Sequence, residues 1–138
     1  MQPEPPTPRP SPGAVPDRID GLAAARHLFA YVAAARIEVA AVAYLDRDRR
    51  VLGMRHVRGT RNAVDVDARL IAIDALTFQA EAVIMAHNHP SGDPHPSRGD
   101  LAAIKRLVRA LDALNVRLLD HLILAGDSHS SMRSLGML

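Results

Sequence analysis

The stretch HNHPSGDPHPSRGD, residues 87–100, holds three histidines, three prolines and two aspartates. It follows the apolar run AVIMA at residues 82–86, which we interpret as a short buried strand. After it, apolar residues recur at helical spacing from Leu101 to Leu111, which predicts a helix. The loop therefore leaves the carboxyl end of a strand, where sites collect in α/β sheets. It is either a structural loop that leads into the helix or a catalytic or metal-binding site.

The surrounding sequence predicts an α/β fold with a mixed sheet sandwiched by helices. An apolar stripe from Leu22 to Val32 predicts a first helix with Asp20 as its N-cap. The other predicted elements are strands at 38–45, 51–59 and 116–125, a helix at 65–80, and a further strand in the last ten residues. The length of 138 residues fits one folded domain, which we place at 19–138.

Residues 1–18 precede this domain and are rich in proline. Seven of the ten prolines lie in the first 16 residues, so we predict a disordered, solvated tail there. An interaction tail is the alternative.

Composition limits the classes of function. The chain has no cysteine, which excludes thiolate nucleophiles and cysteine-ligated zinc. The formal net charge is +2, and the arginines are scattered, so we expect at most weak nucleic-acid binding. The sequence has neither an apolar run of about 18 residues nor a signal pattern, and the expectation is a cytoplasmic protein without a membrane span.

The first chemical signal is the pair His87 and His89. In an extended chain, residues two apart point to the same side, and Pro90 favours an extended His89. Asp100, one turn into the next helix, can supply a third ligand. Three protein ligands and a water are typical of a catalytic zinc site, although iron and manganese stay open.

A hydrolytic metal site also needs a general base. The chain has three glutamates. Glu4 lies in the tail and Glu81 precedes the far end of the histidine-bearing strand, so elimination favours Glu38. The aspartates remain alternatives, as does a plain solvated carboxylate at the start of a strand.

Ser97 has two interpretations. Ser97 and Asp100 have the spacing of a capping box, which explains the serine as a helix cap. Its hydroxyl could instead donate to the oxyanion of a tetrahedral intermediate. One position can serve both roles.

The remaining polar residues give weaker signals. His95, between two prolines, is either a substrate contact or an exposed loop residue. His121 follows Asp120 in an apolar strand; these two residues either support the site from behind the ligands or form a buried pair with each other. The other histidines lack ligand spacing and are predicted to be structural.

Together these residues resemble the motif of JAMM (JAB/MPN+) metalloproteases: a glutamate, then His-x-His, seven residues, Ser, two residues and Asp. With RGTRN at 58–62 and LLDHLIL at 118–124, the chain is similar to the RadC branch over about residues 20–138. The resemblance implies a cytidine-deaminase-like α/β/α sandwich. It also implies one Zn²⁺ per chain on His87, His89 and Asp100, with Glu38 as general acid/base and Ser97 as oxyanion support.

The function we expect is a zinc-dependent metallohydrolase that cleaves peptide or isopeptide bonds, with a protein or peptide as substrate. The alternative from another class is a RadC-like accessory protein of DNA repair or replication without peptidase activity. A metal-free interaction module is a third possibility, against which the intact ligand set argues.

Overall fold

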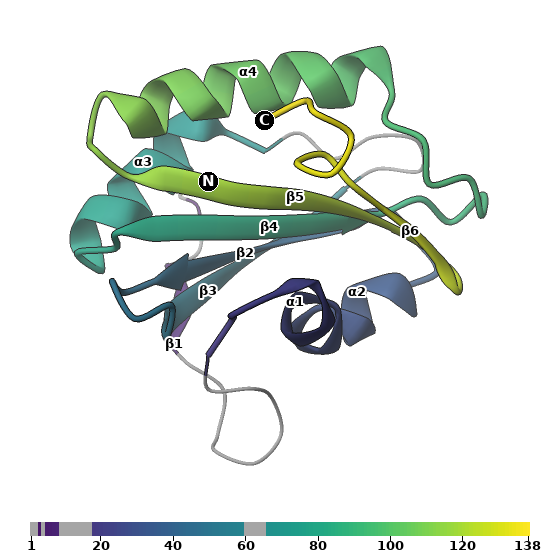
Figure 1. The fold of residues 1–138 in the computed structure, drawn as a ribbon, viewed down its shortest axis with the longest axis horizontal. Helices are drawn as coiled ribbons and strands as arrows, with labels where there is room; N and C mark the ends of the chain where they lie inside the picture. Colours follow the sequence, from purple (N-terminus) through teal and green to yellow (C-terminus); the bar gives the residue numbers. More distant parts are fainter. Residues whose placement is uncertain (1–2, 4, 9–17, 60–65) are drawn as a thin grey trace.

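A computed structural model describes residues 3, 5–8, 18–59 and 66–138. Their elements in chain order are β1 (Thr7–Pro8), α1 (Leu22–Leu28), α2 (Ala30–Ala33), β2 (Val39–Leu45), β3 (Val51–Arg58), α3 (Ala68–Thr77), β4 (Ala82–Asn88), α4 (Arg98–Asp112), β5 (Arg117–Ala125) and β6 (Ser128–Ser131) (Figure 1). None of the helices in this described part has the length and apolar character needed to cross a bilayer.

The strands form one mixed sheet, so the predicted α/β architecture is confirmed at that level. The strand order is β1-β3-β2-β4-β5-β6. Only β4 and β5 pair in parallel; the other neighbours are antiparallel. Ala40 on β2 lies opposite His87 on β4, which brings the start of β2 beside the end of β4.

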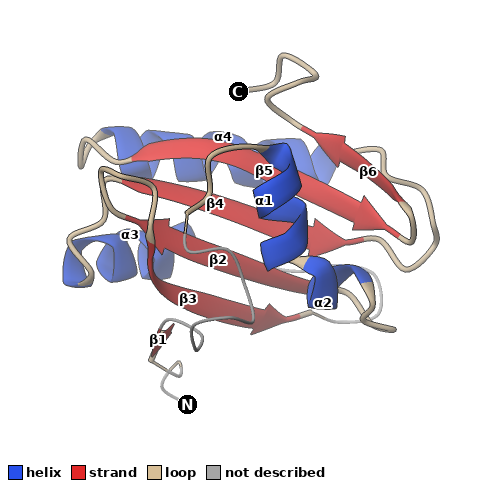
Figure 2. Cartoon of the chain, turned by 60° about the horizontal axis from the view of Figure 1, so that its bottom comes forward, coloured by secondary structure: helices blue, strands red, loops and turns tan. Residues whose placement is uncertain are grey.

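The helices cover both faces of this sheet (Figure 2), with α1 and α2 on one face and α3 and α4 on the other. Strand alternation divides the core accordingly. On β2, Ala41 and Ala43 pack with α1 and α2, whereas Val42 and Tyr44 pack with α3 and α4. Burial on both faces explains why β2 and β4 are apolar almost throughout.

The first helix differs from its prediction in two ways. It is interrupted at Phe29, because the Val32 amide donates to the Phe29 carbonyl only three residues back, at 2.9 Å, and the chain tightens there. The N-cap is Gly21, with no side-chain capping bond, so the prediction of Asp20 as the cap is wrong. The helix begins one residue too late for the Asp20 carboxylate to serve it.

The predicted tail is not free throughout. Thr7 and Pro8 pair with Met54 and Gly53 of β3, so the prediction of disorder is wrong at these two residues. An edge strand tolerates proline because one side of it needs no amide donor. Most of the remaining tail lies outside the described residues, as do residues 60–65.

Strand ends also differ from the predictions. The β4 strand extends two residues beyond the predicted 82–86, through His87 to Asn88, because both residues continue the ladder with β5. Of the last ten residues, only those up to Ser131 are in β6, and turns follow.

A buried charged cluster, which the sequence did not indicate, connects α3 to the sheet. The Asp74 carboxylate accepts hydrogen bonds from the Tyr44 hydroxyl, at 2.6 Å, and from the Arg55 guanidinium, with Nη2 at 2.9 Å. Nearby, the Phe78 ring lies so close to Gly53 that a Cβ atom there would stand 2.3 Å from the ring. Gly53 therefore allows α3 to approach the sheet.

Candidate metal centre

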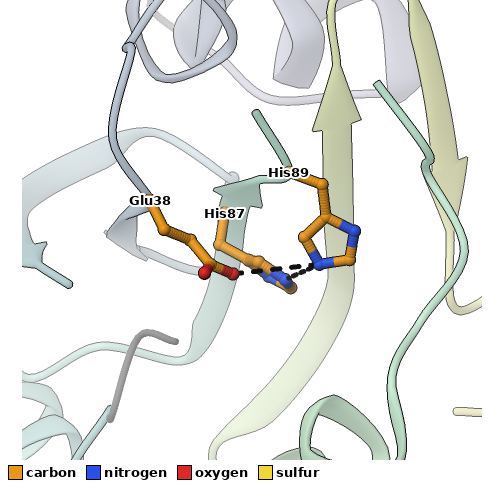
Figure 3. A group of neighbouring side chains, drawn as sticks. All are labelled: Glu38, His87 and His89. Carbon is orange, nitrogen blue, oxygen red and sulfur yellow. Dashed lines mark hydrogen bonds and ion pairs between the residues drawn. The ribbon is translucent and has the colours of Figure 1, made fainter. Parts of the chain in front are cut away.

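The two histidines of the motif converge at the end of β4. His87 is in the strand and buried, His89 follows Asn88, and alternation directs both rings to the α3/α4 face. Their Nε2 atoms lie 3.0 Å apart (Figure 3). The expectation that both rings point to one side is confirmed.

The His89 ring is oriented by the loop that follows it. Its Nδ1 lies 2.8 Å from the Asp93 carbonyl oxygen, which can only accept, so Nδ1 carries a proton and, in a neutral ring, Nε2 has the lone pair that a metal needs. The loop returns to His89 through a turn in which Gly92 has φ 88° and its amide donates to the His89 carbonyl. Glycine suits this left-handed position.

The His87 ring is oriented by His121, which lies on the neighbouring strand β5. His87 Nδ1 lies 2.5 Å from His121 Nε2, and a cavity of about 20 Å³, room for one water, adjoins both rings. Burial lowers the pKa of His121 well below 6.5, helped by the neighbouring imidazoles, so this ring is neutral. With Nδ1 of His87 engaged, its Nε2 is available toward His89.

The Asp120 carboxylate does not bond the His121 ring, because consecutive strand residues face opposite sides of the sheet, although it accepts from the His121 backbone amide at 2.7 Å. It also accepts from the Ser131 hydroxyl and the Arg133 amide. Of the two alternatives, a buried Asp120–His121 side-chain pair is therefore wrong. Of these two residues, it is His121 that supports a ligand, through its contact with His87.

Asp100 faces both imidazoles from the start of α4. Its Oδ1 lies 3.3 Å from His87 Nε2 and its Oδ2 lies 3.3 Å from His89 Nε2. Burial alone would raise the pKa of Asp100, but hydrogen bonds from His87 and the Ser97 amide together hold it well below its ordinary value. The carboxylate is therefore ionised.

Ser97 forms the capping box that the spacing predicted. Its Oγ accepts from the Asp100 amide at 3.0 Å, and the Asp100 carboxylate accepts from the Ser97 amide at 2.8 Å. This exchange fixes the Asp100 side chain at the helix start. It uses the Ser97 oxygen only as an acceptor.

Glu38 precedes β2 and is 7% exposed. The antiparallel register that pairs Ala40 with His87 continues to bring Glu38 beside His89. Its Oε1 lies 3.9 Å from His89 Nε2 (Figure 3). Glu38, His87 and His89 each offer a ligand atom within 4.8 Å of the others, a set that could hold a metal ion.

The donor set fits a small divalent cation. In a tetrahedral zinc site with bonds of about 2.0–2.2 Å, ligand atoms lie about 3.3–3.6 Å apart. The His–His separation of 3.0 Å and the His–Asp separations of 3.3 Å are close to this spacing. The Glu38 oxygen at 3.9 Å is farther out, although it belongs to the mutually close set. Because the two Asp100 contacts involve different oxygens and Glu38 belongs to the mutually close set, both carboxylates are candidates for the third ligand.

The motif also contains residues that the structure does not bring to this centre. The His95 side chain is 86% exposed and bonds Asp93, so a substrate contact stays a prediction. Two supports were missed from the sequence: the Asp93 carbonyl, which no side-chain pattern signals, and Asn88. Asn88 could have been noticed because it is a polar residue at a strand position whose side chain must face the core opposite the histidines.

Comparison with known proteins agrees with this arrangement. The RadC-like JAB domain profile matches residues 20–137. The chain belongs to the RadC-like JAB domain family. The resemblance seen in the motif is thereby confirmed.

The curated relatives are named UPF0758 proteins. One from Verminephrobacter eiseniae is 43% identical over 102 residues, which are 73% of this chain and 43% of that protein. One from Delftia acidovorans is 40% identical over 117 residues, covering 84% and 52%. A third, from Cupriavidus pinatubonensis, is 41% identical over 126 residues, covering 90% and 55%. The chain spans about half the length of these relatives.

Proposed function

We propose that this RadC-like JAB domain is a zinc-dependent hydrolase of peptide or isopeptide bonds, with His87, His89 and Asp100 as its ligands. The observation that carries the proposal is the state of the two imidazoles. Each Nδ1 has a partner, the Asp93 carbonyl or His121, and each Nε2 points to a shared centre that Asp100 also faces. This is how supporting contacts orient histidine ligands.

A zinc ion held there would supply Lewis acidity, which lowers the pKa of water and polarises a carbonyl group. Glu38 would accept the proton of the attacking water and return it to the leaving amine. Its position supports this role, since the carboxylate is nearly buried and its Oε1, at 3.9 Å from His89 Nε2, is farther from the imidazoles than the Asp100 oxygens at 3.3 Å. A base must be near the water rather than on the ligand tetrahedron.

Ser97 would donate to the oxyanion that forms when water adds to the carbonyl. The capping bond occupies its oxygen as an acceptor and leaves the hydroxyl hydrogen for a second interaction. Cap and donor are therefore compatible at one serine.

We assign the mixed sheet with helices on both faces to the cytidine-deaminase-like α/β/α class as part of this proposal. The substrate would be a protein or peptide. The exposed Asp93–His95 pair in the loop would be accessible to such a substrate.

The test combines metal analysis with one substitution. Protein purified without added metal should contain about one zinc per chain. Glu38→Gln should retain this zinc and lose about 100-fold or more in hydrolysis of peptide and isopeptide-linked substrates, as expected for a lost general base.

Two results would contradict the proposal. Wild-type protein that neither contains zinc nor takes it up at micromolar concentration has no metallohydrolase centre. Loss of zinc from Glu38→Gln would make Glu38, in place of Asp100, the third ligand.

A further inference from the structure

Asn88 lies between the two histidines but faces away from them. It is the last residue of β4 and only 1% exposed. Alternation directs its side chain to the α1/α2 face, the same face as Ala86 and opposite to His87. It therefore does not enter the metal centre.

The Asn88 amide bonds the segment that joins α2 to β2. Its Oδ1 accepts from the Val39 amide at 2.7 Å. Its Nδ2 donates to the carbonyls of Ala35 and Ile37, each at 3.0 Å. Both donor hydrogens of the side chain are used, and so is its acceptor.

Two of these three backbone partners, Ile37 and Val39, are the immediate neighbours of Glu38. A third tie holds Glu38 itself, since its carbonyl accepts from the Gly59 amide at 2.9 Å. The start of β2 is therefore fixed to β4 by a side chain, and the Glu38 carboxylate is directed to the opposite face, toward His89.

From this geometry we infer that Asn88 is a positioning residue for Glu38. The end of β4 therefore fixes both parts of the centre. It carries His87 and His89 on the α3/α4 face, and through Asn88 on the α1/α2 face it holds the segment that positions the Glu38 carboxylate. The inference rests on the proposed function. It adds that Asn88 sets the distance between the general base, Glu38, and the histidine ligands. Misplacement of a reacting group by about 1 Å can cost about 100-fold in rate.

A purely structural role makes a different forecast. Loss of a buried amide that bonds three backbone groups should lower stability in any case. Only a positioning role requires that the loss of turnover depend on Glu38. A double-mutant cycle separates the two roles.

The experiment compares Asn88→Ala, Glu38→Gln and the double variant, all loaded with zinc. We expect Asn88→Ala to retain zinc, to lower kcat about 10- to 100-fold and to leave KM within about 2-fold. In the Glu38→Gln background it should lower kcat by no more than about 2-fold. Asn88→Asp keeps the acceptor for Val39 but sets a buried carboxylate oxygen against the Ala35 and Ile37 carbonyls, so its kcat should fall at least as far as that of Asn88→Ala.

Tyr44→Phe serves as the stability control. It removes the bond to Asp74, far from the start of β2, and should lower thermal stability without lowering kcat. Equal losses of kcat from Asn88→Ala in both backgrounds would overturn the inference, as would wild-type turnover in the folded variant.

A readout that needs no turnover is amide hydrogen exchange at Val39. In Asn88→Ala the Val39 amide loses its acceptor and should exchange at least about 10-fold faster, whereas Ala41–Tyr44 in the middle of β2 should not change. Unchanged exchange at Val39 overturns the inference even in an active zinc enzyme. Faster exchange together with the Glu38-dependent loss of kcat supports it, whereas a folded, zinc-loaded wild type that cleaves no peptide contradicts the proposed function and leaves the exchange result as evidence that Asn88 fixes the start of β2.

Discussion

Two polar clusters lie on the same face of the sheet and differ in how the hydrogen-bonding needs of their side chains are met. Between α3 and the sheet, the Asp74 carboxylate is matched by the Tyr44 hydroxyl and the Arg55 guanidinium. At the end of β4, the Nε2 atoms of His87 and His89 and the Asp100 carboxylate converge on one point. Donors from the protein satisfy the first cluster, whereas in the second the imidazoles and the carboxylate need a proton or a cation between them.

The difference teaches how a structural cluster is told from a binding centre. A buried ion pair that meets its own hydrogen-bonding needs requires nothing else. Converging acceptors repel one another unless a cation or proton lies between them. We therefore expect substitutions in the first cluster to change stability and substitutions in the second to change metal binding and turnover.

The largest effect should come from His87→Ala. It removes a ligand, so zinc content should fall to background and hydrolysis with it, while circular dichroism still reports a folded protein. His95→Ala, in the same loop but 86% exposed, is the matched control and should bind zinc as wild type does. Zinc binding by His87→Ala at wild-type strength would mean that the centre is not built on this pair.

Asp74→Ala should have the opposite profile. It removes the buried carboxylate that accepts from Arg55 and Tyr44, and breaking a buried ion pair typically costs about 3–5 kcal/mol in the free energy of unfolding. Denaturant titration measures this loss, and the fraction that stays folded should still bind one zinc. Asp127→Ala, exposed in the β5–β6 turn, should change stability by less than about 0.5 kcal/mol. A loss of zinc affinity in folded Asp74→Ala would show that the two clusters are coupled.

Ser97→Asn tests the serine that belongs to both a cap and the proposed reaction. Asparagine caps helices about as well as serine, so stability should change little. Loss of the oxyanion donor should lower kcat about 100-fold in folded, zinc-loaded protein. Wild-type kcat would leave Ser97 a helix cap only.

The smallest effect concerns pH. The pKa of His121 is lowered well below 6.5 in the folded protein, so below about 6.5 the unfolded chain binds a proton that the folded chain does not. Stability of metal-free protein should therefore fall as pH drops from about 6.5, by up to about 1.4 kcal/mol per unit from this residue. Urea titrations between pH 7.5 and 5 in the presence of a chelator measure the slope. His121→Gln should have a shallower slope, and an equal slope would assign the pH dependence to other groups.

The sequence predicted what depends on short-range pattern. Alternation and helical spacing located the sheet and the long helices, and the spacing of Ser97 and Asp100 gave the capping box. Glu38 was found by elimination, and its approach to His89 depends on the β2–β4 register, which the local sequence does not encode.

Contacts made by backbone groups or by long-range packing were beyond prediction. The bond from His89 to the Asp93 carbonyl involves an atom that every residue has, so composition gives no signal for it. The Tyr44–Arg55–Asp74 cluster joins β2, β3 and α3, whose relative positions only the tertiary fold sets. Thr7 and Pro8 pair with β3 although prolines surround them in the sequence, because an edge strand needs amide donors on one side only.

The alternation of β4 also limits how this motif can change by insertion and deletion. One residue added or removed within 82–86 would turn Asn88 toward the α3/α4 face and both imidazoles toward the α1/α2 face. The same change would displace the chain against both β2 and β5, which hold β4 in fixed registers. The segment from Ala82 to His89 must therefore keep its length in any protein that retains this centre, even where nearly every residue before His87 is replaced by another apolar one.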